Sequence, residues 1–317
     1  MRDMDLPTIP GDYYSPFGPS GDFFRSVEQL PKALEKHGVH LKPGSRFVRL
    51  KAVLENMRDA RVSDLGENEL YFLLHGMQEM RYLRTILSAF SKPTDYLRQR
   101  LEHLVSGAEL AVLDKGNTAQ ARNYQFELYS VAMFHHAGFS VQLCEPPDGM
   151  LVDHGQQFGI AAKRVSSDSK VQRNISDGRD QLVAAGVRGY IMMDVTGIVC
   201  RDRPFIVAKE RGVIDKLVPN RLAAYEGKVK QMLLRKFVDG PVIAVFLFAS
   251  HPGIAGCRQV STSGRSGFEV LPGEVPSLHV SFGTRMIYPN RSDEHIINRV
   301  SPRYSAAYKE HYLLPEL

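Results

Sequence analysis

Hydrophobic residues recur at helical spacing through much of the first third of the chain. Between residues 70 and 90 they return every three or four positions, which predicts one strongly amphipathic helix. Pro and Asp at 91–95 interrupt this pattern, and it resumes at 96–105. Residues 1–25 are rich in Pro, Gly and aromatic residues, which favours an irregular arm. We therefore predict an N-terminal arm and helical domain over residues 1–112.

Short apolar runs alternate with helical patterns after residue 113. The expected order is a helix at 118–137, strands at 139–143, 150–152 and 158–162, a helix at 170–185, a strand at 189–194, a helix at 215–237 and a strand at 242–248. The first three strands are close enough in sequence for an antiparallel meander, whereas the later ones need crossover helices and should be parallel. The pattern predicts an α/β fold with a mixed central sheet flanked by helices, its core spanning residues 113–250.

Residues 251–317 have a different character from the core. Gly, Ser and Pro are frequent, and a single apolar alternation runs through 278–287. We expect a C-terminal extension that contributes one strand and packs on the core.

The composition is that of a globular protein and gives no sign of a secreted or membrane-spanning one. A hydrophobic content of 43% over 317 residues is enough to bury a sizeable core. The net charge of +5 is compatible with a polyanionic partner without requiring one. Three widely separated cysteines, and no apolar run long enough for a signal peptide or a membrane span, predict a cytoplasmic protein without a membrane partner.

Two acids and a lysine occupy informative positions in the predicted core. Glu127 lies beside the apolar face of the first core helix, Asp148 follows Pro147 at the start of the second strand, and Lys163 ends the third strand. Carboxylates at such places can bind a hard cation, and a nearby lysine can orient water and stabilise developing phosphate charge. By residue type and position, the three are candidates for a cation-binding site.

The Pro147-Asp148 pair and the Lys163-Arg164 strand end resemble the PD-(D/E)xK, or restriction-endonuclease-like, nuclease superfamily. The resemblance covers about 70 to 130 residues and implies a metal-dependent endonuclease acting on DNA, in nucleic-acid defence or processing. It further implies that Mg²⁺ or Mn²⁺ binds Asp148 and Glu127, with help from Asp153, while Lys163 assists the attacking water.

One residue departs from the family pattern. The acid expected two positions before the lysine is replaced by Ala161, which lies 13 residues after Asp148, a spacing that fits the family. Three explanations stay open: an artificial change to alanine, an acid supplied from elsewhere such as Asp153 or Glu145, or a natural relative that does not cleave.

Polar residues after the third strand are candidates for contacts with a nucleic acid. They are Arg164, Lys170, Arg173, Arg179 and Gln181, and they can equally form the solvated face of a helix. The alternative function is a non-catalytic nuclease-fold module that binds nucleic acid or a protein. A homo-oligomer, or a protein partner held by the N-terminal helical region, is a further expectation.

Overall fold

The computed structural model describes residues 14–15, 18–19, 21–58, 60, 65–108, 119–201, 205–237, 240–262, 265–274, 276–288 and 293–310. Its helices are α1 (Gly21–Glu35), α2 (Arg46–Asn56), α3 (Glu67–Ala89), α4 (Asp95–Leu104), α5 (Ala119–His136), α6 (Asp168–Ala184), α7 (Thr196–Val199), α8 (Arg211–Phe237) and α9 (Glu294–Glu310). The predicted arm over residues 1–25 and the predicted domain boundary after residue 112 lie largely or wholly outside the described residues.

The strands form one large sheet and two small ones. The large sheet contains β3 (Ser140–Leu143), β4 (Gly149–Asp153), β5 (Gln156–Arg164), β6 (Gly189–Asp194), β8 (Val242–Ala255) and β11 (Ser277–Ile287), and β7 (Ile206–Val207) pairs with β8. Two-stranded sheets are formed by β1 (Tyr14–Ser15) with β2 (Gly18–Pro19) and by β9 (Cys257–Thr262) with β10 (Arg265–Val270).

The seven-stranded sheet is mixed, with the order β11-β8-β6-β5-β4-β3 along its main path. The strands β3, β4 and β5 form an antiparallel meander, whereas β5, β6 and β8 are parallel. The predicted α/β class, the meander and the parallel strands are confirmed. This topology brings the carboxyl ends of β5, β6 and β8 to one edge of the sheet.

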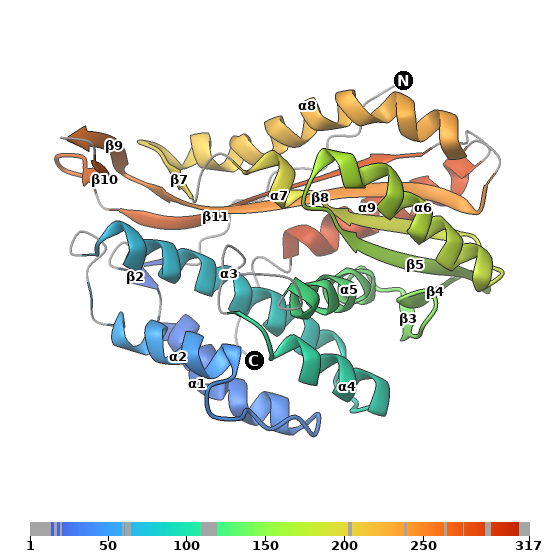
Figure 1. The fold of residues 1–317 in the computed structure, drawn as a ribbon, viewed down its shortest axis with the longest axis horizontal. Helices are drawn as coiled ribbons and strands as arrows, with labels where there is room; N and C mark the ends of the chain where they lie inside the picture. Colours follow the sequence, from blue (N-terminus) through green and yellow to red (C-terminus); the bar gives the residue numbers. More distant parts are fainter. Residues whose placement is uncertain are drawn as a thin grey trace.

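Helices cover both faces of the sheet (Figure 1). One apolar cluster joins α3, α5 and α9 to one face, and a second joins α6 and α8 to the other. Every residue of β8 is buried, as expected for a strand covered on both sides. The helices α1, α2 and α4 lie beyond α3 and α5 and form an outer layer (Figure 1).

The C-terminal region is more regular than its sequence predicted. The strand β8 continues to Ala255, so the predicted boundary after residue 250 falls inside a strand. Eleven residues of β11 pair antiparallel with β8 and complete the sheet. The helix α9 packs on α5 through Tyr304, whose ring centroid is 5.0 Å from that of Phe134. The segment is therefore part of the main core as well as an extension of the chain.

A close approach of two backbones fixes how β5 meets β6. A Cβ atom added to Gly189 would lie 2.0 Å from the carbonyl oxygen of Gly159. No side chain fits at that distance, so glycine is required where β6 begins. The pairing continues from this point to Lys163 and Arg164 at the end of β5.

Candidate functional site

Asp148 lies in the turn that joins β3 to β4 and is almost fully buried. Its Oδ2 atom accepts a hydrogen bond of 2.6 Å from the backbone N–H of Ala162 in β5. Burial raises the pKa of Asp148, although the positive charge of Lys163 and the Ala162 hydrogen bond act in the opposite direction. The carboxylate is thus held against the strand that carries the candidate lysine.

Lys163 comes close to this carboxylate. Its Nζ atom lies 3.8 Å from Asp148 Oδ2 and donates a 2.6 Å hydrogen bond to the Oε1 atom of Gln181 on α6. The lysine side chain keeps 16% of its exposure, so its ammonium group is anchored at two points and still reachable. Gln181, which was considered for contact with a nucleic acid, instead positions the lysine.

Glu127 belongs to the same electrostatic environment. Burial, followed by the negative charge of Asp148, raises the pKa of this α5 residue to about 7. The positive charges of Arg100 and Lys163 lower the pKa but do not cancel the increase. The negative charge of Asp148 thus opposes the ionisation of Glu127, and a cation bound near them would favour the charged form of both carboxyl groups.

Arg100 and its partners also belong to this site, although the sequence did not indicate them. Arg100 on α4 forms an ion pair with Glu145, donates a 3.0 Å hydrogen bond to Tyr96 Oη and lies over the ring of Tyr124. Tyr96 Oη in turn donates to the carbonyl oxygen of Cys144, at 2.8 Å. The helical region therefore braces the turn that carries Asp148. The sequence gives no local signal for this contact, because Arg100 is 45 residues from Glu145.

Ala161 is fully buried and lies next to Asp148. Gly149 pairs with Ile160 in the antiparallel ladder, so the following positions on the two strands, 148 and 161, face each other. A carboxylate at position 161 would thus lie beside that of Asp148. The side chain present there offers no oxygen.

Asp153 is not brought to this site. It ends β4, five residues from Asp148 and roughly 16 Å along an extended strand. Its Oδ2 atom lies 3.0 Å from Arg299 Nε and its Oδ1 atom lies 3.5 Å from an Arg303 nitrogen, both on α9. The expected role of Asp153 as a metal ligand is therefore replaced by a structural one, since its charge is matched by two arginines.

Most of the basic candidate residues at the end of β5 and on α6 have acidic neighbours. Arg164 Nε lies 3.2 Å from Asp194 Oδ2 at the end of β6, on the α5 side of the sheet. On α6, Lys170 is exposed, Arg173 lies 3.8 Å from Asp177, and Arg179 lies 2.7 Å from Asp180. Acidic neighbours thus offset three of these four charges.

Two lysines of α8 have acidic neighbours as well. Lys228 lies 2.8 Å from Asp168, and Lys230 lies 3.3 Å from Glu226. Interactions with a phosphate backbone would have to compete with these pairs, which weakens the expected electrostatic attraction.

A divalent cation needs several oxygen ligands. Within the described residues, no group of three or more His, Cys, Asp or Glu side chains is arranged to hold a metal ion. Mg²⁺ is commonly bound by one or two carboxylates, with water and substrate phosphate filling the other positions. Glu127 and Asp148 meet that smaller requirement, and their mutual repulsion would decrease on binding. The residues therefore fit a weakly held hard cation.

Comparison with known proteins adds no family to this description. The chain matches no family model, no curated protein and no solved structure. Among the residues that the structure describes, no helix combines the length and apolarity needed to cross a bilayer.

Proposed function

We propose that this protein is a metal-dependent nuclease-type domain, similar to the PD-(D/E)xK superfamily, whose substrate is DNA and whose site lacks one acid at Ala161. The observation that carries the proposal is the shared environment of Glu127, Asp148 and Lys163, in which the lysine Nζ lies 3.8 Å from the aspartate. Three groups of the type needed for phosphodiester hydrolysis thus come together from α5, the β3–β4 turn and the end of β5.

Each residue has a defined task in this proposal. Glu127 and Asp148 would hold Mg²⁺ or Mn²⁺, which polarises a phosphoryl oxygen and lowers the pKa of water. Lys163 places a positive charge where negative charge develops on the phosphate, and Gln181 fixes the position of its ammonium group. Arg100 keeps the turn that bears Asp148 in place through Glu145.

The alanine at position 161 determines how much nuclease activity we expect. Without an acid beside Asp148 the cation has one protein ligand fewer, so it should bind weakly and cleavage should be slow or absent. The buried alanine also supports the second candidate function, a non-catalytic module that binds nucleic acid or a protein.

The test compares the unaltered chain with Ala161→Glu and with Ala161→Gln, which has nearly the same shape without the charge. Single-stranded and double-stranded DNA would be incubated with Mg²⁺ or Mn²⁺, after circular dichroism has established that each variant is folded. Cleavage by Ala161→Glu alone, and its loss when Lys163→Met is added, would support a nuclease site complete except at position 161.

Two other outcomes have clear meanings. Equal cleavage by all three proteins would support a nuclease but refute the assignment of position 161. If the folded Ala161→Glu variant neither cleaves DNA nor binds Mn²⁺ more tightly than Ala161→Gln, the nuclease proposal is wrong and the binding module is favoured.

A further inference from the structure

The turn between β3 and β4 carries a second acid close to Asp148. Glu145 lies three residues before Asp148 in the chain. The backbone N–H of Cys144 donates a 3.5 Å hydrogen bond to the carbonyl oxygen of Asp148, so the two ends of the turn lie side by side. The side chain of Glu145 therefore starts from a backbone position near that of Asp148.

The carboxylate of Glu145 is exposed and is held at one oxygen. Its Oε2 atom accepts a hydrogen bond from Arg100 Nη2, and 57% of the side chain is exposed. No hydrogen bond to its Oε1 atom is found in the part of the chain that the structure describes. A carboxylate can bind separate partners through its two oxygens. The second oxygen of Glu145 is thus available to a ligand, and the side chain can turn without displacing a packed neighbour.

Arg100 places Glu145 beside the part of α5 that bears Glu127. The guanidinium carbon of Arg100 lies 4.4 Å from the centre of the Tyr124 ring. Tyr124 precedes Glu127 by three residues on α5, so these two side chains share one face of the helix. Burial is the main cause of the raised pKa values of Glu127 and Asp148, and the negative charge of Glu145 adds to both. Glu145 is therefore within electrostatic reach of both candidate ligands.

The candidate cation site has room for one more acidic ligand. Ala161 offers no oxygen, and the charge of Asp153 is matched by two arginines of α9. As the described residues lie in the structure, no three acids form a ligand set, so Glu145 has to turn towards the other two to join them. Its exposure allows this movement.

We propose that Glu145 is a third carboxylate ligand of the cation site, with Arg100 bound to one of its oxygens and the cation to the other. This inference rests on the proposed function, because it concerns the same cation. Arg100 is then a positioning residue, since it directs the carboxylate of Glu145 and does not itself touch the cation.

The test measures Mn²⁺ binding to the full chain, by calorimetry and by the electron paramagnetic resonance signal of the free ion. Glu145→Gln removes the charge but keeps a carbonyl oxygen that can accept the hydrogen bond from Arg100, so the turn should stay in place. We expect Mn²⁺ to bind about tenfold more weakly, because the affinity for a hard cation depends on the number of charged ligands. Glu145→Ala should weaken binding to a similar degree and serves if the first variant does not fold.

The matched control is Glu102→Gln on α4. Glu102 is also an exposed acid paired with an arginine, because its Oε1 atom lies 3.5 Å from Arg98 Nη1 and 51% of its side chain is exposed. This change removes the same charge and should leave Mn²⁺ affinity unchanged. A second control repeats the comparison in about 0.5 M KCl, where salt screens charges that act through solvent much more than it weakens a direct ligand.

Each outcome decides the inference. Weaker binding by folded Glu145→Gln, kept in high salt and not shared by Glu102→Gln, would support it. An equal loss in both variants, or a loss that disappears in high salt, would show a long-range effect of charge and overturn it. Unchanged affinity in folded Glu145→Gln, with binding lost in Asp148→Asn, would overturn it and leave the proposed cation site standing. If the unaltered protein binds no Mn²⁺, the cation site itself is wrong and the inference is overturned with it.

Discussion

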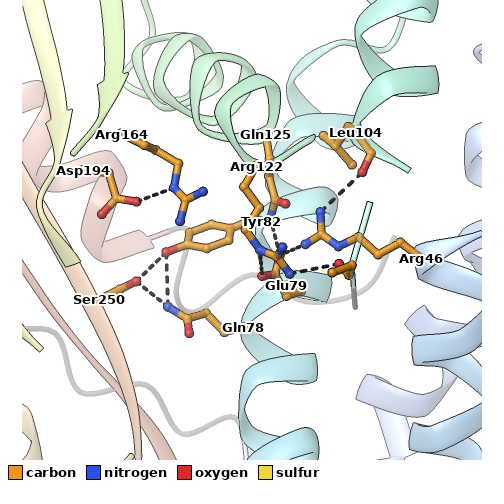
Figure 2. Close-up of polar contacts among 11 residues, drawn as sticks. Arg46, Gln78, Glu79, Tyr82, Leu104, Arg122, Gln125, Arg164, Asp194 and Ser250 are labelled. Atoms are coloured by element: carbon orange, nitrogen blue, oxygen red, sulfur yellow. Dashed lines mark hydrogen bonds and ion pairs between the residues drawn. The ribbon is translucent and has the colours of Figure 1, made fainter. Parts of the chain in front are cut away.

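A buried ion cluster should contribute strongly to the stability of this protein. Glu79 on α3 forms ion pairs with Arg46 of α2 and Arg122 of α5, and it also accepts a hydrogen bond from Gln125 (Figure 2). Arg46 is fully buried, Arg122 is 4% exposed and Glu79 is 7% exposed. One carboxylate thus links the outer helical layer to the helix that carries Glu127.

The expected magnitude follows from burial and from the pKa. Burial raises the pKa of Glu79, but Arg46 and Arg122 outweigh it and lower the pKa from 4.5 to about 2. At about 1.4 kcal/mol per pKa unit this difference corresponds to about 3 kcal/mol of folding free energy. Glu79→Gln would remove the carboxylate that these two buried guanidinium groups share, and we expect it to lower the free energy of unfolding at pH 7 by about 3–5 kcal/mol.

The sign of the pH dependence can be worked out from the same pKa. Because the folded-state pKa lies below the usual value of 4.5, the stabilisation is fully present above about pH 4.5. It is lost as the pH falls through about 2. The difference in stability between the unaltered protein and Glu79→Gln should therefore shrink as the pH falls from about 4.5 to about 2.

Urea unfolding followed by circular dichroism measures these differences. The matched control is Glu55→Gln, which removes an i,i+4 pair with Lys51 whose side chains keep 33% and 27% of their exposure. Such a pair contributes about 0.3–0.5 kcal/mol. If Glu79→Gln costs no more than Glu55→Gln, or if its effect is the same at pH 3 and pH 7, the reasoning is refuted.

Three further outcomes are expected. Mn²⁺ should raise the thermal unfolding midpoint of the unaltered protein but not that of Asp148→Asn, because a ligand that binds the folded state stabilises it. Equal shifts in the two proteins would exclude Asp148 as a metal ligand. Asp153→Asn should lower the free energy of unfolding by about 1–3 kcal/mol through its lost pairs with Arg299 and Arg303, without changing Mn²⁺ affinity in calorimetry. Gly189→Ala should lower it by about 1–3 kcal/mol or more, because the added Cβ would meet the Gly159 carbonyl oxygen at 2.0 Å; unchanged stability in urea would mean that the strands separate easily at this point.

Local patterning was sufficient to predict the main elements. The apolar spacing at 70–90 corresponds to α3, and the order of core helices and strands corresponds to α5 through β8. The meander also followed from sequence, because strands joined by a few residues pair antiparallel. The strand expected at 278–287 corresponds to β11, whereas the full length of β8 was missed, since Gly and Pro within 251–256 gave the appearance of a loop.

The candidate site was only partly predictable. Glu127, Asp148 and Lys163 could be proposed from their types and order, because the chemistry of acids and lysine at strand ends is general. The sequence could not predict two other contacts. These are the contact of Arg100 with Glu145 and the pairing of Asp153 with Arg299 across 146 residues. Such contacts depend on how α4 and α9 pack against the core, and no local pattern encodes which distant charge a carboxylate will meet.

The pocket between α3, α5 and the carboxyl ends of β5, β6 and β8 is also a product of tertiary packing. Its walls come from α3, α5 and the ends of three strands, and none of these segments is distinctive alone. Hydrophobic periodicity and turn residues specify each element because they act between neighbours in the chain. The ion pairs that join these elements exist only after the elements have packed, because they depend on distances between residues far apart in sequence.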